Sequence, residues 1–228
     1  MGFGRDIVPF AYRNEEGDLV GYDVACAYDM ARSLNVKLVF VPVAYHKLEE
    51  DVKQGIMDLW AGGVYVVESR MLWGAFSQAY YHSPMALMVP SSRVPEFMDM
   101  DEILSRPNLA IAVFDNPVTK ALARNLFPQA KQVVVPDYGH LPTAKGWDAA
   151  LWTLEQAGVW ASGHPGYTAV RPKHMGAMIT FAYLMHKDSG RMRQLVNHWL
   201  DNRQAEGFLA RQRAYWIEGA VAGGVRSR

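Results

Sequence analysis

The sequence has a single cysteine, no long apolar run and no excess of either charge. Cys26 has no second cysteine to pair with, so the 228-residue chain can form no internal disulfide. Basic and acidic residues number 23 each, and without a basic stripe nothing indicates nucleic-acid binding. No apolar run approaches the roughly 20 residues that span a bilayer. Half of the residues are hydrophobic, which allows a buried core and excludes a disordered chain.

The common catalytic and metal-binding motifs are missing as well. The seven histidines do not form an HExxH pattern, and one cysteine cannot supply a cysteine-rich zinc site. No GxSxG, Walker or GxGxxG motif occurs in its proper context. Cys26 stands between two alanines in a helical pattern and is expected to be a small buried residue. We therefore expect no metal, no cofactor and no enzymatic activity.

Helical and extended segments alternate along the chain, which is typical of an α/β protein. Apolar residues at helical spacing predict a helix at 22–34 and another after a cap at Asp188 or Ser189. Further helices are expected at 46–54, where a short polar segment ends at Gly55, at 118–127 after Pro117, and at 147–157 and 205–217. Short apolar runs predict strands at 37–42, 58–62, 109–113 and 132–135. Residues 83–89 and 179–185 read as extended connectors between two such sets.

Two connectors imply that the chain crosses between two lobes twice, as in proteins that close about a hinge. We expect lobe 1 to comprise residues 1–85 and 184–228, and lobe 2 to comprise residues 86–183, each a sheet packed with helices. The first residues read as a strand and a loop without a signal peptide. We therefore expect that the full protein has further residues before Met1 that are missing from this sequence.

Several short motifs of the first eighty residues occur in the order typical of one family. They are Pro9-Phe10 with Tyr12, Gly17–Val24, Gly55–Leu59, Glu68-Ser69-Arg70, Phe76-Ser77 and Tyr80-Tyr81. On these motifs the chain resembles the bacterial extracellular solute-binding proteins of family 3. The resemblance implies a type II periplasmic-binding-protein fold. It also implies a periplasmic location and capture of a small carboxylate by hinge closure, for an ABC permease.

The second half of the chain resembles a narrower group. Its motifs are Gly158-Val159-Trp160, Pro165–Pro172, Asn197–Leu200 and Tyr215–Gly219. They are similar to solute-binding domains fused to cation:dicarboxylate symporters, so the membrane partner could be a fused symporter instead of an ABC permease.

The resemblance assigns the ligand's carboxylate to Arg70. A guanidinium suits that task because its fork makes two parallel, charge-assisted hydrogen bonds. Phe10, Tyr12, Gly63 and Tyr65 are the expected walls of the cleft near it. For Phe10, ordinary core packing is an equally good interpretation, and Arg70 could instead be a surface arginine.

In lobe 2, Asn116 and His164 are the candidate ligand-binding residues. Asn116 precedes a helix whose free amides could receive a carboxylate, although capping alone would also explain it. Amino-acid binders of the family carry a late aspartate for the ligand's ammonium group, and the stretch matched to it, Ala161–Pro165, has no carboxylate. His164 lies in that stretch, so we expect an organic acid or an atypical amino-acid-like ligand. A purely structural role remains the alternative for His164.

Two other functions stay open at this point. The first is an enzyme on the same scaffold, resembling cyclohexadienyl dehydratases, with Glu68 or His164 as acid or base. The second is the ligand-sensing module of a signalling receptor.

Overall fold

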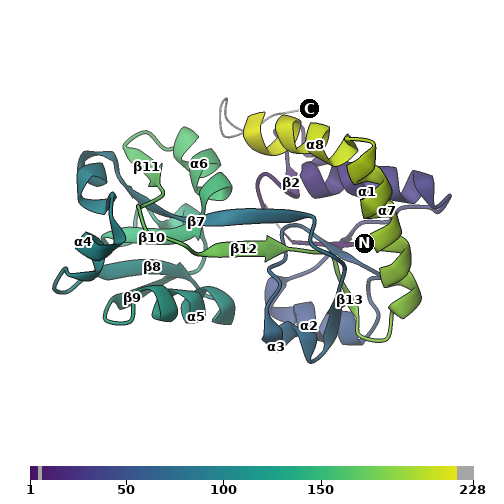
Figure 1. Ribbon diagram of the computed structural model, residues 1–228, viewed down its shortest axis with the longest axis horizontal. Coiled ribbons are helices and arrows are strands. Elements are labelled where there is room, and N and C mark those ends of the chain that lie inside the picture. The colour runs from purple at the N-terminus through teal and green to yellow at the C-terminus, as the bar shows by residue number, and fades with distance from the viewer. Residues whose placement is uncertain (5–6, 220–228) are drawn as a thin grey trace. The chain divides into compact units, whose positions relative to one another are not determined.

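The computed structural model describes residues 1–4 and 7–219, which form two compact units (Figure 1). Unit 1 contains Met1–His82 and the chain from Thr180 onward, and unit 2 contains Ser83–Ile179. The chain passes between them within strands β7 (Tyr81–Pro90) and β12 (Met178–Phe181), which pair with each other. The borders lie a few residues before those expected from the sequence, and each strand continues through its border without a break.

The sheet of unit 1 has the order β4-β1-β5-β13-β6. Strand β1 pairs in parallel with β4 and β5, and β13 pairs antiparallel with β5 and β6. The bounds are β1 Gly2–Phe3, β4 Val41–Pro42, β5 Trp60–Ala61, β6 Gly74–Phe76 and β13 Leu184–His186. The strands expected at 37–42 and 58–62 are thus real but much shorter.

The helices of unit 1 lie near their predicted ranges, except for a short helix at 68–71 that the sequence analysis did not predict. They are α1 Tyr22–Ser33, α2 Leu48–Lys53, α3 Glu68–Met71, α7 Gly190–Ala205 and α8 Phe208–Arg213. A hairpin of β2 (Tyr12–Arg13) and β3 (Leu19–Val20) precedes α1. The helix expected over 205–217 begins later, because Gly207 adopts a left-handed φ of 71° that separates α7 from α8. A π-helical turn, Ala214–Glu218, follows α8.

The sheet of unit 2 has the order β11-β7-β10-β8-β9, with β12 also paired to β7. Strands β8, β9 and β10 are mutually parallel along that order, whereas β7 runs antiparallel to β10 and β11. The bounds are β8 Ala110–Phe114, β9 Lys131–Val135, β10 Ala149–Thr153 and β11 Tyr167–Val170. The helices are α4 Met100–Leu104, α5 Pro117–Leu126 and α6 Leu154–Ser162.

The prediction of one helix over 147–157 is wrong. Residues 149–153 form strand β10, and α6 begins only at Leu154 and runs through Gly158. All five residues of β10 are buried, because the strand lies between β7 and β8 in the sheet. A strand buried on both faces is apolar throughout, so its hydrophobic pattern matches that of a buried helix.

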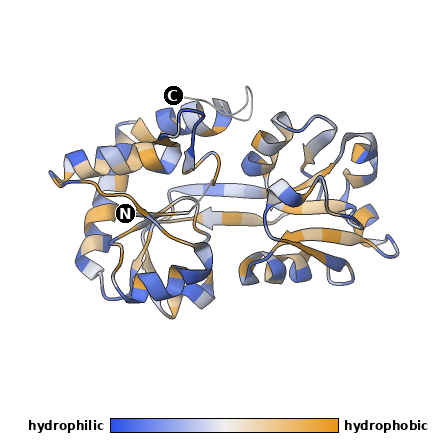
Figure 2. Ribbon diagram, turned by 180° about the vertical axis from the view of Figure 1, so that it is seen from behind, coloured by the Kyte–Doolittle hydropathy of each residue, from blue (hydrophilic) through white to orange (hydrophobic). Residues whose placement is uncertain are grey.

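The core of unit 2 lies against this central strand. Met88, Ala112, Ala150 and Trp152 pack there with the helix residue Ala157. Figure 2 shows the strands of this sheet as mostly hydrophobic ribbons. No described helix is long and apolar enough to cross a membrane.

Candidate functional site

The parallel strands of unit 1 bring three loops to one edge of its sheet. Strands β1, β4 and β5 run in the same direction, so the segments that follow them emerge together. Tyr45 follows β4, whereas Gly62, Gly63 and Tyr65 follow β5. In open α/β sheets this carboxyl edge is where ligands bind. The predicted residues Gly63, Tyr65 and Arg70 therefore come from one short stretch of chain at a suitable edge.

Arg70, on the short helix α3, is a buried cation, with 6% of its surface exposed. Its Nη1 donates a hydrogen bond to the Tyr65 carbonyl oxygen at 2.7 Å, and its Nη2 donates to the Tyr45 hydroxyl. The guanidinium carbon also lies 5.3 Å from the centre of the Tyr45 ring, a cation–π distance. Among residues 1–4 and 7–219, no acidic side chain forms an ion pair with Arg70. Within the described part of the chain, the partners of this buried charge are therefore neutral.

The segment that leads to Tyr65 is held by a second buried charge, Asp23 of helix α1. Its Oδ2 accepts hydrogen bonds from the Gly62 amide at 2.6 Å and the Gly63 amide at 2.9 Å. The Tyr80 hydroxyl donates to the same oxygen at 2.9 Å. Burial raises the pKa of Asp23 to about 6, although these three hydrogen bonds act to lower it. Sequence reasoning did not select Asp23, because an aspartate in a first helical turn reads as an ordinary helix start.

Two predicted wall residues belong to the core of unit 1. Phe10 is fully buried and stacks on Phe181 with ring centres 4.9 Å apart. Tyr12 is 2% exposed and packs edge-on against Trp216 at 6.5 Å. The ring neighbours of both side chains belong to unit 1. Tyr65 is only partly buried and packs edge-on against Phe181 at 5.3 Å, so it is the better wall candidate.

The corresponding edge of unit 2 carries Asn116 and the residues that follow β10. Strands β8 and β10 are parallel, with Ala112 opposite Ala150, so the starts of α5 and α6 lie at the same edge. Asn116 caps α5: its side-chain oxygen accepts from the Thr119 amide at 2.8 Å and from the Thr119 hydroxyl at 3.1 Å. Its oxygen is thus occupied by the cap, and its amide nitrogen is the group that a ligand could use.

Glu155 is the acidic residue at this edge that sequence reasoning missed. It lies in the first turn of α6, is 9% exposed, and accepts a hydrogen bond from the Ser83 hydroxyl of β7. Beside it, the Thr153 hydroxyl donates to the Gln156 side chain at 2.8 Å, and both residues are buried. The sequence did carry a signal, since polar residues follow the apolar run of β10 directly. That run was predicted to be part of a helix over 147–157, so the end of a strand was not recognised there.

His164 does not lie at this edge. It follows the carboxyl end of α6. The next strand, β11, begins with Tyr167 opposite Pro90, which lies beside the amino end of β10 and thus at the opposite edge of the sheet. The ring stacks on Trp160 at 3.7 Å, and its Nδ1 lies 2.8 Å from the Trp160 carbonyl oxygen. The stretch Ala161–Pro165 therefore lies one helix length away from the edge that carries Asn116, and a ligand-binding role for His164 stays a prediction. Glu68, the other proposed acid or base, is exposed on α3.

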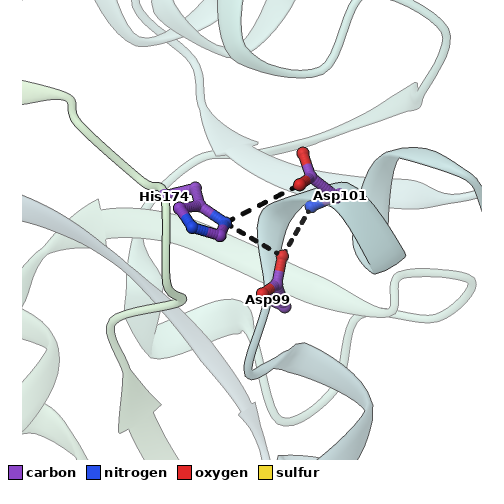
Figure 3. Close-up of side chains that lie close together, drawn as sticks. All are labelled: Asp99, Asp101 and His174. Carbon is purple, nitrogen blue, oxygen red and sulfur yellow. Dashed lines mark hydrogen bonds and ion pairs between the residues drawn. The ribbon is translucent and has the colours of Figure 1, made fainter.

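One group of described side chains has the composition of a metal site. The Nδ1 atom of His174 lies 3.4 Å from Asp99 Oδ1 and 3.7 Å from Asp101 Oδ2 (Figure 3). Asp99 also caps α4 by accepting from the Asp101 amide at 3.0 Å. The side chains of His174 and Asp101 are 66% and 84% exposed. Helix capping and a surface ion pair explain this group, and we assign no metal to it.

Two α/β units, joined by two strands and each with polar residues at the carboxyl edge of its sheet, define the class of type II periplasmic binding proteins. The model of the family described as bacterial extracellular solute-binding proteins, family 3, matches residues 1–219. The chain therefore belongs to that family.

Individual relatives include binding proteins and an enzyme. The chain is 27% identical over 217 residues to a cyclohexadienyl dehydratase of Pseudomonas aeruginosa, with 93% of this chain and 80% of that protein covered. A similar structure is an amino acid ABC transporter substrate-binding protein of Streptococcus pneumoniae bound to L-arginine. Its TM-score is 0.83 and its identity 21%, with 99% and 96% of the two chains covered.

A putative ABC transporter binding component of Wolinella succinogenes, complexed with lysine, has a TM-score of 0.84 at 20% identity, with 95% of each chain covered. At these identities, the two structures establish the fold alone.

Proposed function

We propose that this chain captures a small amino acid or a related carboxylate outside the cytoplasm, in the periplasm, and delivers it to a membrane transporter. The observation that carries the proposal is Arg70. A charge taken out of water is costly unless an opposite charge or several hydrogen bonds compensate it. The described partners of Arg70 are one carbonyl and one hydroxyl, both neutral. A ligand carboxylate would supply the missing negative charge.

Glu155 supports an amino acid over a plain organic acid as the ligand. It puts a buried carboxylate at the carboxyl edge of unit 2, whereas the sequence indicated no carboxylate for the ammonium group in Ala161–Pro165. An ammonium group is the natural partner of such a carboxylate. Within unit 1, Arg70 is the candidate partner of the ligand's carboxylate; within unit 2, Glu155 is the candidate partner of an ammonium group. Closure of the two units on the ligand, driven by contacts made only when it is bound, completes the proposed capture.

The transport partner is proposed to be an ABC permease, in keeping with the family, with a fused dicarboxylate symporter as the alternative. The experiment that tests the binding proposal is a thermal-shift screen. It would include the twenty common L-amino acids and a set of mono- and dicarboxylates, because a ligand that binds only the folded state raises the melting temperature. We expect at least one amino acid to raise it in the wild type and not in Arg70→Met. If no anion or amino acid raises it, the proposal fails.

A second candidate function is a dehydratase acting on a cyclohexadienyl acid. The 27% identity to a cyclohexadienyl dehydratase over most of the chain keeps this function open. Glu155 is then the candidate general acid, because a carboxyl at this edge could donate a proton to a leaving hydroxyl. In this case Arg70 would hold a carboxylate of the substrate.

The two candidates separate in one assay. Incubation with prephenate, a cyclohexadienyl acid, should leave the compound unchanged if the chain only binds its ligand. Catalysed loss of prephenate that disappears in Glu155→Gln but persists in Glu68→Gln would establish the enzyme instead. The Glu68 variant is a matched control because that side chain is exposed on α3.

A further inference from the structure

Asp23 ties together three segments of unit 1 that meet behind the Arg70 site. Its own amide donates to the Phe10 carbonyl at 2.9 Å, which fixes the start of α1 on the loop after β1. Its carboxylate accepts from the amides of Gly62 and Gly63 and from the Tyr80 hydroxyl. One buried side chain thus holds two distant segments by hydrogen bonds to a single oxygen.

The Gly62–Gly63 turn is shaped to present two amides to an anion. The two glycines have φ values of 117° and 66°, in the region that side chains disfavour. Successive amides in such a turn converge and form a small anion-binding concavity. Here the protein's own carboxylate fills it. A Cβ on Gly63 would also lie 3.1 Å from the Phe181 ring and 3.3 Å from the Phe10 ring.

The segment after this turn carries the carbonyl that orients Arg70. Tyr65 lies two residues beyond Gly63, and its carbonyl oxygen accepts from Arg70 Nη1 at 2.7 Å. The same segment pairs on its other side with residues 180–182, through the amide of Val66 and the carbonyl of Val64. Tyr80, whose hydroxyl meets Asp23, donates its own amide to Phe181 in that stretch at 3.0 Å. Residues 64–66 pair with residues 180–182, and Asp23 holds both partners: the first through the Gly62–Gly63 turn, the second through Tyr80.

We propose that Asp23 is a positioning residue of the ligand-carboxylate site. It fixes the Gly62–Gly63 turn, and through it the Tyr65 carbonyl that aims the Arg70 guanidinium. This inference rests on the proposed function of Arg70, but the arrangement of the turn can be measured without any ligand.

The negative charge of Asp23 can be followed because its neighbours stay neutral. Burial raises the pKa of the tyrosine and cysteine side chains that face it, so none of them ionises near neutral pH. These neutral side chains are Tyr22 and Cys26 of α1, Tyr80 before β7, and Tyr183 before β13. The positive charge of Arg213 on α8 acts to lower the pKa of Tyr22, but burial outweighs it. A change in the turn near pH 6 that is lost in Asp23→Asn therefore reports on Asp23 itself.

The test compares the amide signals of Gly62 and Gly63 and the Nε–H signal of Arg70 in nitrogen-15 NMR spectra. In the wild type, the two glycine amide shifts should titrate with a midpoint near pH 6, the raised pKa of Asp23. In Asp23→Asn the titration should vanish, while the Arg70 signal stays close to its wild-type position because an amide oxygen can still accept. In Asp23→Ala the Arg70 signal should shift, and exchange of the glycine amides should quicken at least about tenfold.

Asp29→Ala is the matched control, because Asp29 is a buried acid on the same helix that bonds Trp199 and Arg203 instead. If it changes the Gly62, Gly63 and Arg70 signals as much as Asp23→Ala does, the inference is overturned. Unchanged signals in Asp23→Ala also overturn it. Calorimetric titration of each variant with L-arginine and with succinate adds the functional readout. A wild type that binds neither probe argues against the proposed function, while the NMR signals still decide the role of Asp23.

Discussion

Replacing Asp23 by asparagine should remove a specific pH dependence of stability. The carboxyl has no exposed surface, and its pKa rises from 3.8 to about 6 on folding, mainly because burial disfavours the charged form. A raised folded-state pKa means that the folded state binds the proton more tightly than the unfolded state. The contribution of Asp23 to stability is therefore complete below about pH 4 and is lost as the pH rises through about 6. Two pKa units correspond to about 3 kcal/mol.

The assay is urea unfolding of the wild type and Asp23→Asn at several pH values from 4 to 7. The free energy of unfolding of the wild type minus that of the variant should fall by about 3 kcal/mol over this range. Taking the difference cancels the titration of all other groups. A difference that stays flat, or that rises with pH, would refute the reasoning.

Asp29→Asn is a control of opposite sign. Burial of Asp29 acts to raise its pKa, but hydrogen bonds from Arg203, Trp199 and Arg32 outweigh it, so the pKa is lowered. Its stabilisation is present above the unfolded-state pKa and is lost as the pH falls through the folded-state value. The corresponding difference should therefore rise with pH.

Two further predictions concern the edges of the two sheets. Gly63→Ala should lower the free energy of unfolding by about 1–3 kcal/mol, because the φ of 66° and the close Phe181 ring both oppose a Cβ. Chemical denaturation would measure this change, and an unchanged stability would contradict this account of the turn. Glu155→Gln should weaken binding of an amino acid about 10- to 100-fold, since a charge-assisted hydrogen bond to the ammonium group contributes about 1.5–3 kcal/mol, and should leave binding of a plain carboxylate nearly unchanged. Calorimetric titration would show it, and equal losses for both ligands would speak against contact with the ammonium group.

The sequence was sufficient to predict the alternation of strands and helices and the two crossings. Those follow from local patterns: apolar spacing for α1, short apolar runs for β8 and β9, and a proline directly after Asn116 for the start of α5. The family, which the motifs between Pro9 and Tyr81 indicated, is established by the match over residues 1–219.

What local patterns could not reveal depends on neighbours distant in sequence. Strand β10 reads as a helix because a strand buried on both faces loses its alternation, and that error hid Glu155. His164 follows the carboxyl end of α6, a placement that its local sequence did not reveal. The burial of Phe10 depends on Phe181, which no local pattern near Phe10 reveals.

The role of Asp23 was equally hidden. Its partners, Gly62, Gly63 and Tyr80, lie 39 to 57 positions away in the sequence. An aspartate in a first helical turn has a sufficient local explanation, so only the folded chain identifies its second role.

The central claim is that the Arg70 guanidinium binds a ligand carboxylate. The most direct measurement is calorimetric titration of the wild type, Arg70→Lys and Arg70→Met with the strongest ligand from the thermal-shift screen. Removal of one partner of a buried charge pair costs about 3–5 kcal/mol, so Arg70→Met should bind at least about 100-fold more weakly. Arg70→Lys should fall between the two, because a lysine keeps the charge but not the fork. Equal affinity of all three proteins for the ligand would contradict the account.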